Sequence, residues 1–190
     1  MKLFEEKINS CGKVLDGNIL KVDAFLNHQI DVALLDEMGK EFYRLYKDAG
    51  ITKILTIEAS GIAIAIMAAR HFGVPMVFAK KGRSANISDE VYHSDAFSFT
   101  HKETRTIVVS KEYLSKDDTI LLIDDFLANG ESLAALVDIC SQAGAKVAGA
   151  GIAIEKEYQN GGNKLRAKGL RIESLAKIAK MDKDGITYMD

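Results

Sequence analysis

The sequence predicts an α/β domain built around a mainly parallel β-sheet flanked by helices. Short apolar runs typical of buried strands alternate with segments whose apolar residues recur at helical spacing. No internal repeat, low-complexity tract or linker interrupts this alternation, and Pro75 is the single proline. The 190 residues are enough for one well-buried domain and too few for two of typical size. We therefore expect one domain over residues 1–190.

The N-terminal part is predicted to contain two amphipathic helices. The first lies near Leu3–Ile8. The second runs from about Val32 to Tyr46, with Asp31 as a plausible N-cap. Its apolar face consists of Leu34, Leu35, Met38, Phe42 and Leu45. Both helices precede the first sheet strand, so this region departs from the strand–helix alternation of the rest of the chain.

The remaining elements follow in strand–helix order. The predicted strands are Lys53–Ile57, Val74–Ala79, Thr106–Ser110, Thr119–Ile123 and Val147–Ile154. An apolar helix over Ile62–Ala69, ending near Gly73, joins the first two. Such βαβ units favour a parallel sheet covered on both faces. Periodicity does not decide whether Ile172–Ile178 is strand or helix, while the Asp-Gly pair within 183–186 predicts a hairpin turn.

The composition is that of an ordinary globular protein. The apolar fraction is 47%, and the formal net charge of −2 argues against bulk nucleic-acid binding. Cys11 and Cys140 lack metal-ligand or disulfide spacing, and Cys140 falls on the apolar face of a predicted helix. No apolar run is long enough to span a membrane, and the N-terminus does not look like a signal peptide. We expect a cytoplasmic protein without nucleic-acid or membrane partners.

The most informative stretch is Ile120–Ser132, where an apolar run ends in two acids, turns through Ala-Asn-Gly and enters a helix. The strand-like run places Asp124 and Asp125 at its carboxyl end, where open α/β sheets bind ligands. Helical spacing begins at Ser132 and continues through Leu133, Leu136, Val137 and Cys140, with Ala143 and Gly144 closing the helix. Paired carboxylates suit a polyhydroxyl group, and a helix N-terminus suits a phosphate. The stretch indicates a sugar-phosphate site; the alternative is a polar turn with solvated or capping acids.

This stretch resembles the motif by which type I phosphoribosyltransferases bind 5-phosphoribosyl-1-pyrophosphate (PRPP). The resemblance implies that Asp124 and Asp125 are catalytic residues facing the ribose hydroxyls. It implies that the 5′-phosphate is held by Ala128, Asn129, Gly130, Glu131 and Ser132. Asn129, Glu131 and Ser132 depart from the commonest form, which has Thr, Gly and Thr there. We expect the Glu131 side chain to point away, because its carboxylate would otherwise face a phosphate.

A second candidate phosphate loop is Glu58–Gly61, between the first strand and its apolar helix. Small residues let backbone N–H groups approach an anion, although many strand–helix turns contain Ser-Gly for structural reasons alone. The family resemblance implies that Ala59, Ser60 and Gly61 bind the pyrophosphate of PRPP. It also implies a Mg²⁺ ion held mainly by substrate oxygens and water rather than by a protein metal site.

A polar stretch separates the second strand from the third. Its basic residues at Lys80–Arg83 are either a solvated turn or, as the resemblance implies, cations that help neutralise the pyrophosphate. Phe97 and Phe99 alternate as in a hairpin. A span this long is usually a functional lid or an excursion hairpin. The resemblance implies a mobile lid within about Lys81–Lys102 that keeps water from the reacting centre.

The segment Leu20–Asp31 mixes polar and apolar residues in a way that generic core packing does not readily explain. It closely resembles the corresponding segment of bacterial xanthine phosphoribosyltransferases, and that resemblance extends over essentially the whole chain. The resemblance implies that Leu20, Asn27 and Lys156 bind xanthine. Xanthine carries two oxo groups, and Lys156 and the Asn27 amide can both donate hydrogen bonds. Taken without the resemblance, the two polar side chains are more simply a helix-flanking turn residue and a solvent-facing lysine.

The resemblance implies a type I phosphoribosyltransferase fold with a small hood, formed by residues 1–50 and 155–190, over the base. It implies transfer of the phosphoribosyl group from PRPP to N9 of xanthine, giving xanthosine 5′-monophosphate (XMP) and pyrophosphate, a purine-salvage step. A homodimer is implied as well. Two alternatives stay open: guanine or hypoxanthine as the preferred base, and a PRPP-sensing regulator without activity. A dinucleotide-binding oxidoreductase is disfavoured because no GxGxxG follows a predicted strand.

Overall fold

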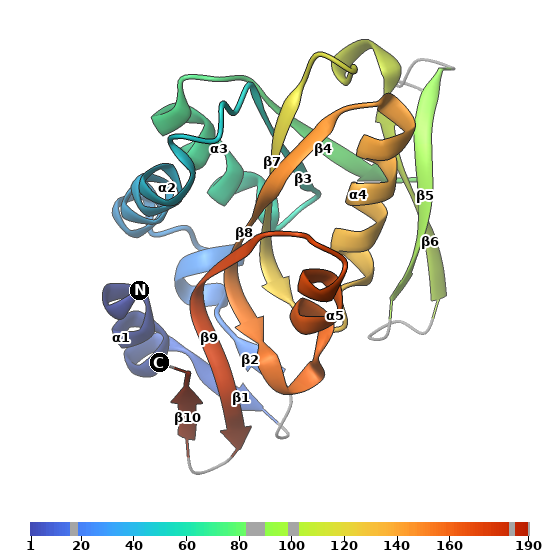
Figure 1. The fold of residues 1–190 in the computed structure, drawn as a ribbon. Coiled ribbons are helices and arrows are strands. Elements are labelled where there is room, and N and C mark those ends of the chain that lie inside the picture. The colour runs from blue at the N-terminus through green and yellow to red at the C-terminus, as the bar shows by residue number, and fades with distance from the viewer. Residues whose placement is uncertain (16–18, 83–89, 99–102, 183–184, 190) are drawn as a thin grey trace.

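The computed structural model describes residues 1–15, 19–82, 90–98, 103–182 and 185–189. Within this part of the chain the main sheet has eight strands in the order β10-β9-β8-β7-β3-β4-β6-β5 (Figure 1). Their bounds are β3 Lys53–Ile57, β4 Met76–Lys81, β5 Val91–Ser98, β6 Glu103–Ser110, β7 Thr119–Leu127, β8 Lys146–Lys156, β9 Ile172–Asp182 and β10 Gly185–Tyr188. A separate antiparallel pair is formed by β1 Lys13–Leu15 and β2 Ile19–Lys21.

The centre of the sheet is parallel and its margins are antiparallel. Strands β9, β8, β7, β3 and β4 run parallel, as the alternating pattern predicts. In contrast, β6 pairs antiparallel with both β4 and β5, and β10 pairs antiparallel with β9. The expectation of a mainly parallel sheet is confirmed. The segment Ile172–Ile178, whose sequence pattern does not distinguish strand from helix, forms part of β9.

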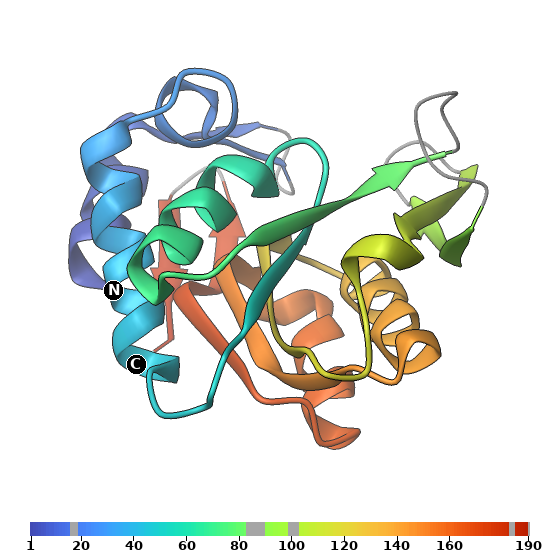
Figure 2. The ribbon, with the colours of Figure 1, turned by 90° about the horizontal axis from the view of Figure 1, so that it is seen from above.

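Helices cover both faces of the sheet (Figure 2). Their bounds are α1 Lys2–Cys11, α2 Val32–Tyr46, α3 Gly61–Phe72, α4 Glu131–Ala143 and α5 Gly161–Ala167. One core cluster joins residues of α1, α2 and α3 to the sheet, and a second joins α4 and α5 to the opposite face together with the β5–β6 hairpin. Burial of apolar surface on two sides fixes the central strands.

The predicted N-terminal helices are confirmed. The Asp31 side chain accepts a hydrogen bond from the Leu34 N–H at 3.2 Å, so it caps α2 as expected. The termini meet on the sheet edge, where the Tyr188 hydroxyl lies 2.9 Å from Asn9 Oδ1 and the amino group of Met1 donates to the Leu175 carbonyl. No described helix is long and apolar enough to cross a membrane.

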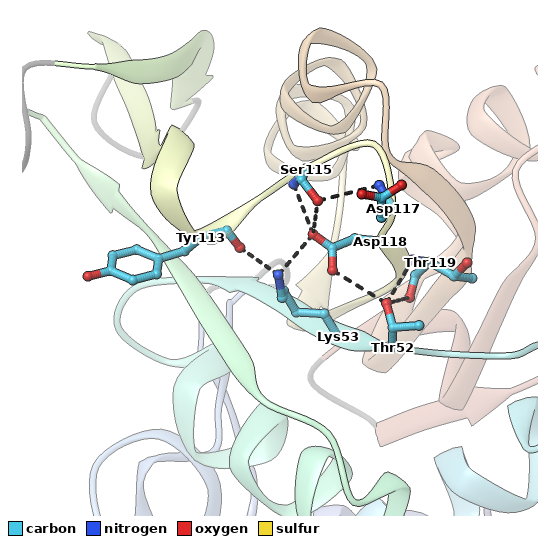
Figure 3. Close-up of polar contacts among 7 residues, drawn as sticks. All are labelled: Thr52, Lys53, Tyr113, Ser115, Asp117, Asp118 and Thr119. Carbon is cyan, nitrogen blue, oxygen red and sulfur yellow. Dashed lines mark hydrogen bonds and ion pairs between the residues drawn. The ribbon is translucent and has the colours of Figure 1, made fainter.

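The strand ends opposite the candidate site carry a dense polar cluster, which we call the amino-edge network (Figure 3). Lys53 Nζ donates to Asp118 Oδ2 and to the Tyr113 carbonyl, both at 2.8 Å. Thr52 joins the same cluster, because its Oγ1 accepts from the Thr119 N–H at 2.9 Å. The network ties the start of β3 to the start of β7 and so sets the register of the two central strands.

Candidate active site

Asp124 and Asp125 lie where the central strands separate. The pairing of β7 with β3 ends at Leu122, whereas β7 continues beside β8 to Leu127. The two acids were predicted to follow a strand ending at Ile123; instead, they belong to the last part of β7. The strand is longer because β8 supplies hydrogen-bond partners that its sequence pattern alone does not reveal. The acids still lie at the carboxyl edge of the sheet, where α/β folds bind ligands.

The two carboxylates have different environments. Asp124 is buried, with 6% of its surface exposed, and its Oδ1 accepts the Asp125 N–H at 3.0 Å. Burial, and next the negative charge of Asp125, raise the pKa of Asp124 well above the ordinary value, while Lys81 acts weakly in the opposite direction. Asp125 is only half-buried. It is therefore the more accessible of the pair to a ligand.

The predicted 5′-phosphate loop follows directly. Gly130 takes a positive φ of 89°, and α4 begins at Glu131, one residue before the expected start. The loop lines a pocket of about 180 Å³ whose walls are Phe97, Asp124, Phe126, Leu127, Ala128, Asn129, Gly130, Glu131, Ser132 and Leu133. Glu131 is exposed, whereas Asn129 and Ser132 are half-buried. All five predicted loop residues therefore line one cavity, at a helix N-terminus suited to an anion.

The second loop lies against the first acid. A Cβ added at Gly61 would lie 3.5 Å from Asp124 Oδ1 and only 2.2 Å from Thr56 Oγ1, so this position accepts only glycine. The first residue of the loop, Glu58, is fixed to β4, because its carboxylate accepts the Lys81 N–H at 2.7 Å. The structure thus brings the start of α3 beside the motif strand, so the two candidate phosphate loops lie on one edge of the sheet.

Thr56 lies at this site, although no motif in the sequence indicated it. Its side chain is fully buried beneath Gly61, and among the described residues its Oγ1 has no hydrogen-bond partner. A buried hydroxyl without a partner is costly, so such groups cluster at functional positions. The available signal was a threonine inside the apolar strand Lys53–Ile57, which strand propensity alone also explains.

The three predicted base-binding residues lie on three elements. Leu20 is buried in β2, and Asn27 is exposed at the end of a short π-helical turn, Asp23–Asn27. Lys156 ends β8, and its ammonium lies 5.6 Å from the centre of the Phe126 ring. Burial lowers the pKa of Lys156. The ring of Phe126 connects Lys156 to the phosphate-loop pocket, whereas Leu20 and Asn27 are not among the residues that line it.

The predicted lid region contains a hairpin. Strands β5 and β6 pair from Val91 to Ser110, and β5 is fixed to α4 because the Gln142 side chain bonds both the N–H and the carbonyl of His93. Most of the basic stretch lies in β4, where Lys80 and Lys81 pair with β6. Residues 83–89 and 99–102, which make up half of the segment where the lid was expected, lie outside the described residues.

Comparisons with known proteins agree with this geometry. A model of the phosphoribosyl transferase domain matches residues 21–171. The solved structure of an APRTase from Giardia lamblia, complexed with 9-deazaadenine, aligns with a TM-score of 0.78 at 26% identity, covering 92% of this chain and 97% of that one. An adenine phosphoribosyl transferase from Trypanosoma brucei aligns with a TM-score of 0.79 at 17% identity, covering 96% and 82%. The second likeness is one of fold alone.

Closer relatives are found by sequence. Proteins named xanthine phosphoribosyltransferase from Staphylococcus aureus strains MRSA252 and JH9 are each 54% identical over 189 residues. The alignments cover 100% of this chain and 98% of each relative. The matching domain, the sheet order and the two loops beside Asp124 all lead to the same assignment. This chain belongs to the phosphoribosyltransferase family.

Proposed function

We propose that this enzyme transfers the 5-phosphoribosyl group of PRPP to N9 of xanthine, forming XMP and pyrophosphate. The observation that carries the proposal is the position of the acidic pair, Asp124 and Asp125, between two anion-type loops on one sheet edge. A ligand phosphorylated at both ends and hydroxylated in the middle matches this order of groups. The choice of xanthine rests on the full-length similarity to relatives with that name.

The proposed roles follow from the chemistry of each group. Asp125 and Asp124 bind the ribose hydroxyls and stabilise positive charge that develops at C1′ as the bond to pyrophosphate breaks. Ala128–Ser132 hold the 5′-phosphate, chiefly through backbone N–H groups at the start of α4. Ala59, Ser60 and Gly61 hold the pyrophosphate, and the Thr56 hydroxyl beneath them is available to this loop. Holding both reactants accounts for a large part of the acceleration.

We expect Mg²⁺ to arrive with PRPP. Among the described residues, no group of three or more His, Cys, Asp or Glu side chains could hold a metal ion. We take substrate phosphate oxygens and water as its main ligands, with the acids of β7 nearby. When bound, the ion neutralises charge on the pyrophosphate.

The base is proposed to lie over Phe126, under a hood built from residues 1–50 and 155–190. Lys156 and Asn27 donate to its oxo groups, and Leu20 packs against it. A wrong base would leave buried donors unpaired at a cost of about 1–3 kcal/mol each. The lysine pKa, lowered by burial, is consistent with a donor held away from solvent. We further expect a cytoplasmic homodimer.

One assay separates this proposal from its alternatives. The protein is mixed with PRPP and Mg²⁺, xanthine, guanine, hypoxanthine and adenine are offered separately, and pyrophosphate release is measured. We expect release mainly with xanthine. Release mainly with guanine or hypoxanthine would change the assigned base. If none of the four bases produced release, the result would favour a PRPP-binding regulator without activity.

A further inference from the structure

A buried ion pair lies one residue before the proposed base donor. Glu155 is 1% exposed, and its two carboxylate oxygens accept Arg166 Nη1 and Nη2 at 2.6 and 2.7 Å. The Ser174 hydroxyl donates to the same carboxylate at 2.5 Å. Burial favours the neutral acid, but the bonds from Arg166 and Ser174 outweigh it, so the pKa of Glu155 is lowered. The carboxylate is therefore held as an anion in a fixed direction.

The helix that carries Arg166 also supports the phosphate loop. The Gly161 N–H, at the start of α5, donates to the Ala128 carbonyl at 3.1 Å. A Cβ added at Gly161 would lie 2.2 Å from that oxygen and 2.6 Å from the Gly130 nitrogen. Leu165 packs on the same loop, since its Cδ1 lies 3.1 Å from the position of a Cβ at Gly130. The loop backbone thus rests directly on α5.

The contact of α5 with the phosphate loop and its contact with the Glu155 carboxylate lie next to each other. A Cβ added at Gly162 would lie 2.0 Å from Glu155 Oε1, so the first turn of α5 fits between the phosphate loop and the buried carboxylate. Glu155 is followed by Lys156 in β8, and successive strand residues point to opposite faces. The ion pair of Glu155 therefore anchors, on one face of the sheet, the same stretch of backbone that presents Lys156 on the other.

We propose that Glu155 and Arg166 are positioning residues that fix the separation between the 5′-phosphate loop and the base donor Lys156. The inference rests on the proposed function, because it takes Ala128–Ser132 and Lys156 as the two ends of one nucleotide site. A nucleotide spans both ends, so its affinity depends on their separation. A ligand that occupies the phosphate loop alone does not sense that separation.

The test compares two ligands by calorimetry. XMP spans both subsites, whereas ribose 5-phosphate occupies only the phosphate loop and the acidic pair. For Glu155→Gln, which keeps the shape but loses the charge, we expect XMP to bind roughly 10- to 100-fold more weakly, the loss expected when a buried donor no longer meets its acceptor. Ribose 5-phosphate should change by less than about 3-fold. Equal losses for both ligands, or no loss for XMP, would overturn the proposal.

The chain offers a matched control. Glu41 also forms a bidentate pair, accepting Arg44 Nε at 2.8 Å and Nη2 at 2.7 Å on the exposed side of α2. Glu41→Gln should leave the binding of both ligands unchanged. Arg166→Lys is made in parallel, because it keeps the cation and disturbs folding less; we expect the same selective loss of XMP affinity, but a smaller one.

The wild-type chain distinguishes failure of this inference from failure of the proposed function. Its affinities for XMP, guanosine 5′-monophosphate and inosine 5′-monophosphate are measured first. If one of the latter two binds best, the choice of xanthine fails, and the variants are judged with that nucleotide. If the wild-type chain binds no purine nucleotide, the proposed function and the inference both fail. Normal wild-type binding with equal losses in Glu155→Gln overturns the positioning role alone.

Discussion

The two edges of the parallel strands use polar residues in opposite ways. At the amino edge, Asp118 accepts hydrogen bonds from Lys53 Nζ at 2.8 Å, from the Ser115 N–H at 2.9 Å and from Thr52 Oγ1 at 3.5 Å (Figure 3). At the carboxyl edge, Asp124 is buried beside a second carboxylate, and Thr56 Oγ1 has no partner among the described residues. The first edge satisfies its polar groups, while the second leaves a buried hydroxyl without a partner and places two acids side by side.

This difference indicates that the amino edge contributes to the stability of the fold, whereas the carboxyl edge carries the candidate active site. Paired groups at the amino edge stabilise the register of β3 and β7. Crowded acids and a buried, unpaired hydroxyl at the carboxyl edge are unfavourable in the free protein, and binding sites commonly accept such costs. Substitutions at the two edges should therefore separate activity from stability.

The largest effect is expected from Asp125→Ala. Removing the more accessible carboxylate takes away stabilisation of positive charge at the ribose, so kcat should fall about 100- to 1,000-fold. The melting temperature should change little, because Asp125 is only half-buried. Pyrophosphate release with PRPP and xanthine measures the first quantity, and thermal unfolding the second. Retained turnover would refute the role of this residue.

Lys53→Met tests the other edge. The variant leaves Asp118, whose side chain is 12% exposed, without its ammonium partner. We expect a loss of about 1–3 kcal/mol in the free energy of unfolding. For a chain of this size, each kcal/mol corresponds to about 2–4 °C in Tm. The value of kcat/KM should stay near that of the wild type; a large fall would mean that the two edges are not independent.

The smallest effect is a difference of sign in the pH dependence of stability. Burial tends to raise the pKa of Asp118, but hydrogen bonds from Lys53 and Ser115 outweigh it, so the pKa is lowered. Its stabilising contribution is therefore present above the ordinary carboxyl pKa of about 4 and is lost as the pH falls through the lowered value. The pKa of Asp124 is raised, so ionisation there costs stability at neutral pH, and acid removes this cost.

Thermal unfolding of Asp118→Asn and Asp124→Asn between pH 3 and 8 measures this contrast. Near pH 7, Asp118→Asn should lower Tm and Asp124→Asn should raise it. Both differences from the wild type should shrink toward acid pH, where the carboxyl groups become neutral. A lowered Tm for Asp124→Asn at pH 7 would contradict this expectation, because it would show that the Asp124 carboxyl group stabilises the folded protein.

Local pattern was sufficient to predict many of the elements. The bounds of α2 and β3 agree with the prediction, because helical periodicity and a continuous apolar run are strong signals. The strands β7 and β8 extend further than predicted, because polar residues follow each apolar run: Asp124 and Asp125 in β7, and Glu155 and Lys156 in β8. Pairing with neighbouring strands holds these segments in the sheet. The antiparallel direction of β6 was not predicted, because strand direction depends on partners distant in sequence.

Some features of the candidate site could likewise be predicted from the sequence, and others could not. Residue types and spacing indicated the motif at Ile120–Ser132. The loop at Glu58–Gly61 was a weak signal taken alone, and its predicted role came from family resemblance, as did the choice of Leu20, Asn27 and Lys156. Thr56 and the Glu155–Arg166 pair were not singled out. Nothing in the sequence distinguishes a buried ion pair eleven residues apart from two solvated charges.

The sequence by itself therefore determined the fold class and indicated the acidic pair and two candidate phosphate loops, because each depends on residues that are neighbours along the chain. Only the tertiary structure decided that Gly61 lies beside Asp124, that Thr56 is buried without a partner, and that α5 joins the phosphate loop to Glu155. These contacts depend on the packing of segments distant in sequence. Local propensity does not encode such packing, because burial is a property of the whole fold.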